Sequence, residues 1–334
     1  MQNYARHDFS DIWDHDNSGN NMTFLERLAD FRPILLDGAT GTELERRGVD
    51  TNTPLWSAIA LLECPELVEQ IHREYLEAGA EIITTNTFRT HRRNLEQVGL
   101  GDQAASLTTL AVKIARNAVE KSGVRSFAAR EKAIRLTPNN ASPQLAYVAG
   151  SMAPLEDSYM ANALPVETYE SEHAEMANNL AAAGVDLLLV ETISTIREAQ
   201  AAARAARATG LPFGVSFICK VDGRMFSGEE LADAVKAVEP HQPNFLGVNC
   251  SAAPTLHKAL ANLRAATALP LAVYANPSHT EDYQHWDETE AAHPEVYAQY
   301  ALGWLQAGAQ LVGGCCGTGP EHIAAIHQLD LVTH

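Results

Sequence analysis

Short apolar runs alternate with longer amphipathic segments along most of this chain. Eight apolar runs predict buried strands: Pro33–Asp37, Ala80–Thr85, Leu145–Gly150, Val185–Val190, Pro212–Ile218, Phe245–Asn249, Leu271–Ala275 and Gln310–Gly313. Segments rich in Ala, Leu and Glu predict helices between the strands: Pro65–Ala78, Asp102–Lys121, Val166–Ala183, Thr195–Thr209, Gly228–Val238, Pro254–Ala266 and Pro294–Ala307. Several of these segments open on Pro or on a Thr cap, which are typical first residues of helices.

Strands that alternate with helices are typical of βα units and of a parallel sheet. Eight such units predict an α/β fold of the (β/α)8 type, the TIM barrel, although the usual size of that fold is about 250 residues. We assign the excess to an N-terminal arm and to three long connections, interpreted as functional loops: Gly38–Cys64, Ser122–Gln144 and Asn276–His293. The alternative is an open doubly wound sheet, which the absence of a Gly-x-Gly-x-x-Gly motif after the first strand disfavours.

The first 22 residues differ from the rest of the chain. They are polar, rich in Asp and Asn, and show no hydrophobic period, so we expect residues 1–22 to form a flexible arm and residues 23–334 to form a single barrel domain. The arm also lacks the apolar core of a signal peptide. No apolar run approaches the roughly 20 residues that span a bilayer, and we therefore expect a cytoplasmic protein.

Composition narrows the possible partners. Hydrophobic residues make up 46% and charged residues 20% of the 334 residues, as in a soluble enzyme with a full core. A net charge of −18 argues against nucleic acid as a partner, and we interpret it as a source of solubility. Five cysteines are an odd number, which does not indicate a disulfide framework. Of these, Cys64 before Pro65 and Cys219 inside an apolar run are interpreted as structural.

The remaining three cysteines form the most distinctive pattern. Cys315 and Cys316 follow an apolar run and two glycines, and Cys250 ends another apolar run. Neighbouring side chains of a strand point to opposite faces, but the flanking glycines permit a turn that brings both sulfurs to one side. Three thiolates without a fourth cysteine or a nearby histidine fit a zinc site with one open position. The alternatives for the pair are a vicinal disulfide and two small buried hydrophobic residues.

Polar residues at the predicted strand ends would meet at one rim of a barrel, where such folds carry their chemistry. These residues are Asp37, Asn86, Ser151, Glu191, Ser216, Asn249 and Asn276. Ser151 and Ser216 are interpreted as ordinary polar strand ends. Glu191 closes a strongly apolar run, where a carboxylate needs a partner or a ligand; a structural salt bridge is the alternative. For Asp37 the alternative is capping of a helix that begins near Thr42.

Seven stretches of the chain match a known family in order: Leu36–Leu44, Pro54–Ala58, Gly79–Phe88, Glu191–Thr192, Gly247–Cys250, Val273–Asn276 and Gly313–Gly317. On these residues the chain resembles the homocysteine S-methyltransferases. That family includes S-methylmethionine-dependent enzymes, betaine–homocysteine methyltransferase and the homocysteine module of cobalamin-dependent methionine synthase. The matches run from about residue 24 to residue 329.

The resemblance implies a barrel in which Cys250, Cys315 and Cys316 hold one Zn²⁺ per chain. The sulfur of homocysteine would take the open position as a thiolate and attack the methyl group of an onium donor, which gives methionine.

The resemblance also implies roles for other strand-end residues. Glu191 would bind the homocysteine ammonium with help from Asp37, and the backbone N–H groups of Gly38 and Ala39 would take its carboxylate. Asn276 resembles the position whose side-chain oxygen occupies the fourth metal site before substrate arrives, whereas Asn249 is interpreted as structural.

The methyl donor stays open at this stage. Pro54–Ala58 and the chain length favour the S-methylmethionine-using branch, with S-methylmethionine or S-adenosylmethionine as donor and betaine or another donor as the alternative. Aromatic side chains that could surround the methyl cation by cation–π contact are Trp56, Phe88, Tyr159, Tyr283 and Trp286. Ordinary packing is the alternative for each of them, and the sequence does not specify the oligomeric state.

Two other function classes remain as alternatives. One is a barrel aldolase that forms a Schiff base on a strand-end lysine, for which Lys220 is the candidate. The other is a non-catalytic barrel that binds zinc and a thiol.

Overall fold

Eight parallel strands lie side by side around a ring in the computed structural model, which describes residues 22–123, 125–126, 145–160, 163–279 and 287–329. The strands are β1 (Ile34–Leu35), β2 (Ile82–Thr84), β4 (Leu145–Met152), β5 (Leu187–Ile193), β6 (Phe213–Ile218), β7 (Phe245–Ala252), β8 (Leu271–Asn276) and β11 (Leu311–Gly314). Each overlaps one of the eight predicted runs, and several extend a few residues past its end. The predicted arm lies outside the described residues except for Met22.

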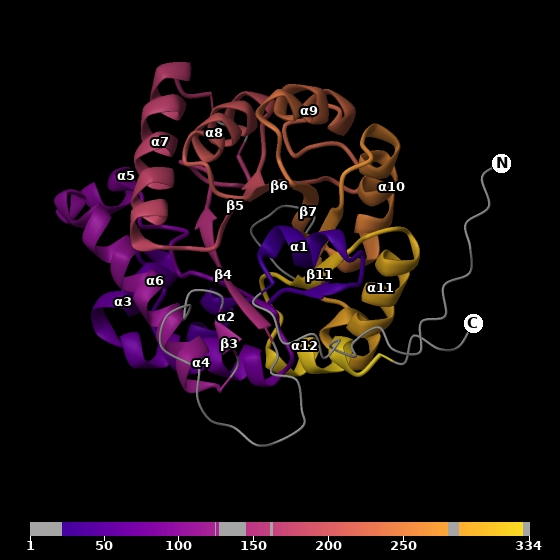
Figure 1. Ribbon diagram of the computed structural model, residues 1–334, viewed down its shortest axis with the longest axis horizontal. Coiled ribbons are helices and arrows are strands. Elements are labelled where there is room, and N and C mark those ends of the chain that lie inside the picture. Colours follow the sequence, from indigo (N-terminus) through magenta and orange to yellow (C-terminus); the bar gives the residue numbers. More distant parts are fainter. Residues whose placement is uncertain (1–21, 124, 127–144, 161–162, 280–286, 330–334) are drawn as a thin grey trace.

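The ring closes between the first two strands of the chain. β1 pairs in parallel with β11, and Leu36, just after β1, forms a parallel bridge with Ile82 of β2. The N–H of Asp37 also donates to the carbonyl of Ile82 at 3.0 Å. The sheet therefore has no free edge at this point, which confirms the barrel and rules out the open sheet. Figure 1 shows the ring with its helices outside.

The outer helices are α2 (Thr40–Arg46), α3 (Ala60–Glu63), α4 (Pro65–Glu77), α5 (Arg92–Glu96), α6 (Ala104–Lys121), α7 (Val166–Ala183), α8 (Ile196–Ala208), α9 (Leu231–Val238), α10 (Leu256–Ala266), α11 (Pro294–Gln306) and α12 (Pro320–His327). Each of the seven predicted helical segments contains one of the outer helices (α4 and α6 to α11), whereas α2, α3, α5 and α12 lie outside those segments. α9 begins three residues later than predicted because Gly228 lies in a turn, with φ of +92° and its N–H donating to the carbonyl of Met225.

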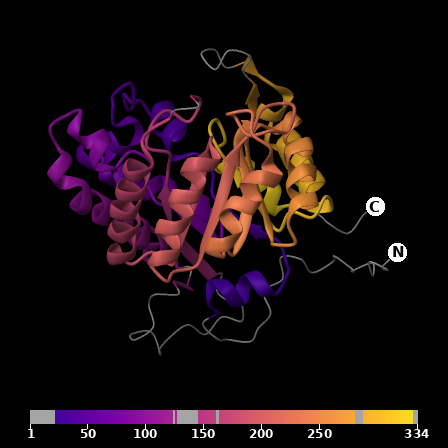
Figure 2. The ribbon, with the colours of Figure 1, turned by 90° about the horizontal axis from the view of Figure 1, so that it is seen from above.

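Helix α1 (Phe24–Ala29) closes the N-terminal end of the barrel. The ring of Phe24 packs edge-on against Tyr147 and Phe245 inside the barrel, at centroid distances of 5.7 and 6.0 Å. The guanidinium of Arg27 pairs with the buried carboxylate of Glu81 at 2.8 Å. Figure 2 shows α1 lying across this end. Access to the barrel interior is therefore from the C-terminal ends of the strands.

One predicted functional loop lies at the wrong end of the barrel. Ser122–Gln144 joins helix α6 to strand β4, and its short strand β3 (Arg125–Ser126) pairs with the first residues of β4. A helix-to-strand connection in this fold lies at the N-terminal end, opposite to the strand ends that carry the polar residues. The interpretation of this segment as a loop of the functional face is wrong. Residues 127–144 lie outside the described part of the chain.

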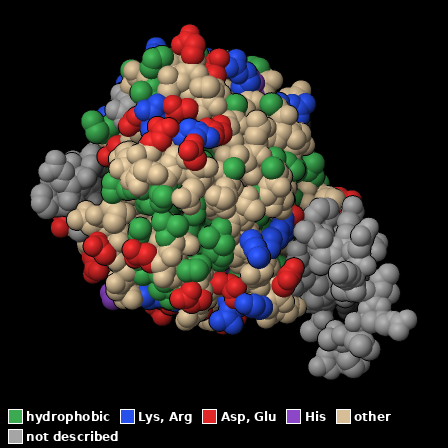
Figure 3. All heavy atoms as spheres, turned by 90° about the vertical axis from the view of Figure 1, so that its left-hand side faces the viewer, with side chains coloured by type: hydrophobic (Ala, Val, Ile, Leu, Met, Phe, Trp, Pro, Cys, Tyr) green, Lys and Arg blue, Asp and Glu red, His purple; other side chains and the backbone are tan. Residues whose placement is uncertain are grey.

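The face formed by α5, α6 and α7 carries mixed charge. Acidic and basic side chains lie next to one another there, with apolar side chains scattered between them (Figure 3). Arg92 and Arg93 of α5 pair across to Glu175 and Glu172 of α7, each at 2.6 Å. Among the described residues, no helix has the length and apolar character needed to cross a membrane.

Candidate active site

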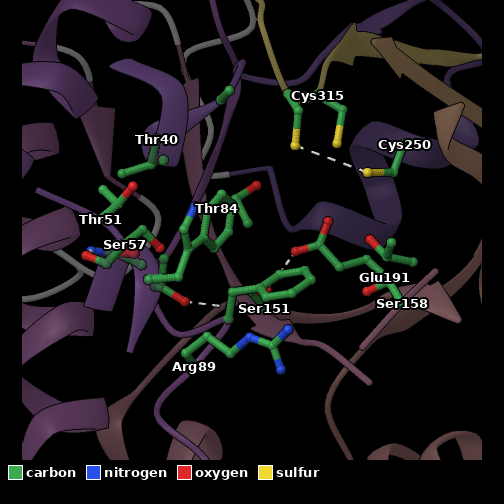
Figure 4. Close-up of a pocket in the computed structure, with 18 of the residues that line it drawn as sticks. Thr40, Thr51, Ser57, Thr84, Arg89, Ser151, Ser158, Glu191, Cys250 and Cys315 are labelled. Atoms are coloured by element: carbon green, nitrogen blue, oxygen red, sulfur yellow. Dashed lines mark hydrogen bonds between the residues drawn. The ribbon is translucent and has the colours of Figure 1, made fainter. Parts of the chain in front are cut away.

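A cavity of about 580 Å³ opens at the C-terminal ends of the strands. This volume lies within the range of pockets that bury small-molecule ligands. Its lining includes three cysteines and two strand-end carboxylates that the sequence singled out: Cys250, Cys315, Cys316, Asp37 and Glu191. Gly38 and Ala39 also line it, whereas Asn276 is not among the lining residues and lies next to Cys250, with its Nδ2 3.8 Å from the Cys250 sulfur. Figure 4 shows Cys250, Cys315 and Glu191 turned towards the same space.

The three sulfurs converge although they come from two distant strands. All three Sγ atoms lie within 4.8 Å of one another, and those of Cys250 and Cys316 are 4.0 Å apart. Cys315 and Cys316 follow β11 in a turn closed by the N–H of Thr318 donating to the carbonyl of Cys315, and Gly317 in this turn has φ of +88°. A turn instead of a strand lets both side chains face the same side, as the glycines predicted.

Cys250 reaches the cavity through a break in strand pairing. The register between β7 and β8 shifts between Asn249 and Ala252, and Cys250 itself has φ of +53°. A left-handed non-glycine residue is unusual and costs free energy, so the surrounding bonds must hold it. A bulge of this kind re-aims a strand-end side chain towards a site. The apolar run in the sequence gave no sign of it.

The arrangement fits a metal ion. Four-coordinate metal–sulfur bonds of about 2.3 Å require sulfurs about 3.8 Å apart, close to the distances found. Hydrogen bonds from Cys315 and Cys316 lower the pKa of the Cys250 thiol and raise the pKa of the two donors. Beside them, Oδ1 of Asn276 is buried without a hydrogen-bond partner among the described residues, and its Nδ2 is 3.8 Å from the Cys250 sulfur. The three cysteines could therefore bind a metal ion and leave a fourth position open.

Asp37 is held by strand β2. Its Oδ2 accepts from the N–H of Thr84 at 2.7 Å and its Oδ1 from the Thr84 hydroxyl at 2.9 Å. Burial raises the pKa of Asp37 to about 8, against the effect of these two bonds. The alternative role as a helix cap is wrong, because α2 begins at Thr40 with Ala39 at its cap position and no side-chain cap.

Glu191 lies at a second bulge, where the pairing of β5 with β6 shifts between Val190 and Ile193. The hydroxyl of Ser151 donates to its Oε1 at 2.5 Å, and burial raises the pKa of Glu191 to about 7. No Lys or Arg is paired with it in the described part of the chain, so the alternative of a structural salt bridge finds no support. A buried carboxylate without a cation is suited to bind a cationic ligand.

Asn249 stabilises the Glu191 bulge. Thr192, the next residue, has φ of +64°, its N–H donates to Oδ1 of Asn249 at 3.1 Å, and its hydroxyl accepts from Nδ2 at 2.8 Å. The Ser216 hydroxyl donates to the same Oδ1 at 2.8 Å. Asn249 and Ser216 are therefore structural, as interpreted from the sequence. Asn86 also lines the cavity, and its Nδ2 donates to the carbonyl of Ser57 at 2.9 Å.

Three of the five aromatic candidates line the cavity. The rings of Trp56 and Phe88 meet edge-on at 5.5 Å, and the hydroxyl of Tyr159 lies 3.2 Å from the sulfur of Cys250. The other two, Tyr283 and Trp286, lie outside the described residues. Trp56 and Phe88 therefore form a continuous aromatic surface, the Trp56–Phe88 wall, and Tyr159 lies at the cysteines.

Lys220 lies away from this space. It is not among the described residues that line the cavity, and its ammonium lies 5.2 Å from the ring centroid of Phe226. The aldolase alternative therefore finds no lysine among the described residues of the site.

Sequence reasoning missed several side chains of the cavity. Ser151 was interpreted as an ordinary strand end, yet it hydrogen-bonds Glu191. Thr84 holds Asp37, and Arg89 and Tyr274 also line the cavity. The position of Ser151 at a strand end was the one available signal, whereas Arg89 lies in a rim loop with no distinctive pattern.

Comparison with known proteins gives consistent matches over most of the chain. The family model described as homocysteine S-methyltransferase matches residues 34–329. A homocysteine S-methyltransferase of Escherichia coli is 34% identical over 313 residues, covering 90% of this chain and 97% of the relative. A selenocysteine methyltransferase of Astragalus bisulcatus is 31% identical, covering 89% of this chain and 92% of the relative.

A solved structure resembles the fold as well. The homocysteine methyltransferase MmuM of Escherichia coli, in a metallated form, superposes with a TM-score of 0.74 at 31% identity, covering 92% of this chain and 99% of that one.

Proposed function

Because this chain belongs to the homocysteine S-methyltransferase family, we propose that it transfers a methyl group from an onium donor to homocysteine at a zinc ion. The main support for this proposal is the convergence of three cysteine sulfurs, all within 4.8 Å of one another, in the wall of a cavity that is also lined by two buried carboxylates. In this proposal Cys250, Cys315 and Cys316 bind one Zn²⁺. Three soft sulfur ligands favour zinc over harder divalent cations.

When bound, zinc would supply the homocysteine sulfur as a thiolate at neutral pH, since coordination deprotonates a thiol outright. The protein residues control how that sulfur is presented. Asn276 is proposed as the resting fourth ligand, supported by its buried, unpartnered Oδ1 next to the sulfurs. The hydroxyl of Tyr159, 3.2 Å from the Cys250 sulfur, would donate a hydrogen bond to the Cys250 thiolate and orient this metal ligand.

Glu191 and Asp37 are proposed to bind the ammonium group of homocysteine. Both are buried and ion-pair with no Lys or Arg among the described residues, so an ammonium would offset the cost of their ionisation. The backbone N–H groups of Gly38 and Ala39, at the start of α2, are proposed to take its carboxylate. These contacts at both ends of the amino acid would point its sulfur towards the cysteines.

The methyl group then moves in one displacement. The homocysteine sulfur forms a bond to the methyl carbon, the bond from that carbon to the donor onium atom breaks, and its electron pair stays on the donor, which leaves neutral at that atom. S-methylmethionine or S-adenosylmethionine is the favoured donor and betaine is the alternative. The Trp56–Phe88 wall supports a cationic methyl donor by cation–π attraction.

We place the protein in the cytoplasm. All five cysteines are free thiols in the structure, and the site requires three of them reduced. A reducing compartment maintains that state.

The direct test is methionine formation from homocysteine with a panel of sulfonium, betaine and folate donors, with and without a chelator. We expect about one zinc per chain and turnover that the chelator abolishes. Cys316→Ala is expected to lose both metal and turnover. Cys64→Ala, at a free cysteine outside the cavity, is the matched control and should keep both.

Two results would contradict the proposal. Cys316→Ala with full turnover and retained metal would show that the sulfurs do not carry the chemistry. Homocysteine binding without methyl transfer from any donor would favour the non-catalytic zinc- and thiol-binding barrel.

A further inference from the structure

Arg89 differs in charge from the other described residues that line the cavity. It is the one Lys or Arg among the described lining residues, which include the acidic residues Asp37, Glu156, Asp157 and Glu191. In Figure 4 Arg89 lies across the cavity from Cys250 and Cys315, with Glu191 between them. A single cation placed opposite the sulfurs, in an otherwise acidic cavity, needs an explanation.

The guanidinium of Arg89 has no hydrogen-bond or ion-pair partner within the described ranges. Two neighbours on α5 are fully engaged: Arg92 pairs with Glu175 at 2.6 Å, and Arg93 pairs with Glu172 at 2.6 Å and Glu156 at 3.1 Å. Arg89 lies over the ring of Phe88, at 5.5 Å from its centroid, and is half-buried. Burial lowers the pKa of Arg89, and Asp157 and Glu156 act in the opposite direction. A partly buried guanidinium whose N–H donors have no partner among the described residues is suited to bind an anion.

The segment that carries Arg89 is held in place independently of any ligand. The N–H of Thr85 donates to the carbonyl of Ala149 at 2.9 Å, and the Thr87 hydroxyl donates to the carbonyl of Ser151 at 2.9 Å. On the other side, the hydroxyls of Thr90 and Thr108 are 2.9 Å apart. Arg89 is thus presented to the cavity by a fixed backbone, which lowers the cost of binding.

We infer that Arg89 binds the carboxylate of the methyl donor. This inference rests on the proposed function and adds the chemistry of the second substrate. The carboxylate would accept two parallel hydrogen bonds from the guanidinium. The onium group of the donor would then lie between Arg89 and the sulfurs, which are on opposite sides of the cavity (Figure 4).

The test compares two donors that differ only in the carboxylate. S-methylmethionine carries it, and its decarboxylated analogue, 3-aminopropyl-dimethylsulfonium, does not. Initial rates are measured for wild type, Arg89→Gln and Arg89→Lys, with Arg92→Gln as the matched control on the adjacent helix. Melting temperatures of all variants check that each is folded.

Arg89→Gln is expected to raise the donor KM for S-methylmethionine roughly ten- to a hundredfold, the range for one charge-assisted hydrogen-bonded pair. The KM for the decarboxylated donor and the KM for homocysteine should stay at wild-type values. Arg89→Lys keeps the charge without the planar fork and should give an intermediate KM. Arg92→Gln should behave as wild type with both donors.

Three outcomes overturn the inference. Equal losses with both donors would make Arg89 structural, a rise in the homocysteine KM would assign it to the acceptor, and no effect would leave it without a binding role. Wild-type enzyme that forms no methionine from any donor in the panel contradicts the proposed function itself, and the inference with it.

Discussion

At the scale of single residues, the site depends on two carboxylates that the fold keeps from water. Burial raises the pKa of Glu191 to about 7 and that of Asp37 to about 8. Both groups therefore carry protons at pH 6 in the ligand-free protein. An ammonium ligand binds the ionised carboxylates and must displace those protons. Its affinity should therefore rise with pH as the two carboxyl groups lose their protons.

Methionine binding isolates this effect, because the product has the ammonium group without a thiol to titrate. We expect the dissociation constant of methionine to fall as pH rises from 6 to 8, by about tenfold per pH unit for each proton displaced. Glu191→Gln should weaken binding and flatten this dependence. Calorimetric titration in buffers of different ionisation enthalpy would measure it. A dependence that is the same in the variant, or that runs in the opposite direction, would contradict the assignment.

At the scale of elements, two strands end in bulges that turn functional side chains into the cavity. Glu191 precedes the left-handed Thr192 on β5, and Cys250 is itself left-handed on β7. Asn249 joins the two strands by hydrogen bonds to the N–H and hydroxyl of Thr192. One buried amide thus supports the geometry of the carboxylate that is proposed to bind homocysteine.

Asn249→Ala should therefore affect both stability and binding. It leaves the N–H of Thr192 buried without a partner, which we expect to cost about 1–3 kcal/mol of unfolding free energy. Release of the bulge should also raise the homocysteine KM by roughly ten- to a hundredfold. Asn244→Ala is the matched control, because its Oδ1 accepts from the N–H of Phe213 at the opposite end of the strands. It should lower stability alone; an unchanged homocysteine KM in Asn249→Ala would contradict the role of the bulge.

The same elements show how far the sequence could be interpreted. Apolar runs predicted all eight barrel strands and capped amphipathic segments predicted seven of the helices around them, because both patterns reflect local burial and backbone preference. The glycines around Cys315 and Cys316 predicted the turn for the same local reason. The bulges at Glu191 and Cys250, and the bonds from Ser151 and Thr84, depend on contacts between strands distant in sequence, which one sequence does not reveal. The loop Ser122–Gln144 was misplaced because its length was considered without its position after a helix.

At the scale of the whole molecule, one end of the barrel is closed and the other is open. Helix α1 seals the N-terminal end with Phe24 and the Arg27–Glu81 pair. The cavity with the three cysteines opens at the opposite end of the barrel. The helices packed around the barrel bury some titratable side chains, and His72 is one of them. His72 of α4 is fully buried, and neither ring nitrogen has a hydrogen-bond partner in the described residues.

His72 should make the metal-free protein sensitive to acid. Burial lowers its pKa from 6.5 to about 4, so the folded state holds a neutral ring while the unfolded chain takes up a proton below about pH 6.5. As far as His72 is concerned, the unfolding free energy is therefore highest above pH 6.5. It falls as pH drops from 6.5 through 4, by about 3 kcal/mol in total.

Urea unfolding of His72→Leu between pH 4 and 7 tests this sensitivity, with His257→Leu at an exposed histidine of α10 as the control. The His72 variant should lose less stability on acidification than wild type. An unchanged pH dependence would contradict this account of His72.

The central claim is that three cysteine sulfurs bind zinc and leave a position for the sulfur of homocysteine. X-ray absorption at the zinc edge, with and without homocysteine, tests it most directly. We predict about three sulfur neighbours and one oxygen or nitrogen neighbour in the resting protein, and about four sulfur neighbours near 2.3 Å once homocysteine is added. A coordination shell that homocysteine leaves unchanged, or one that contains no sulfur at all, would contradict the claim.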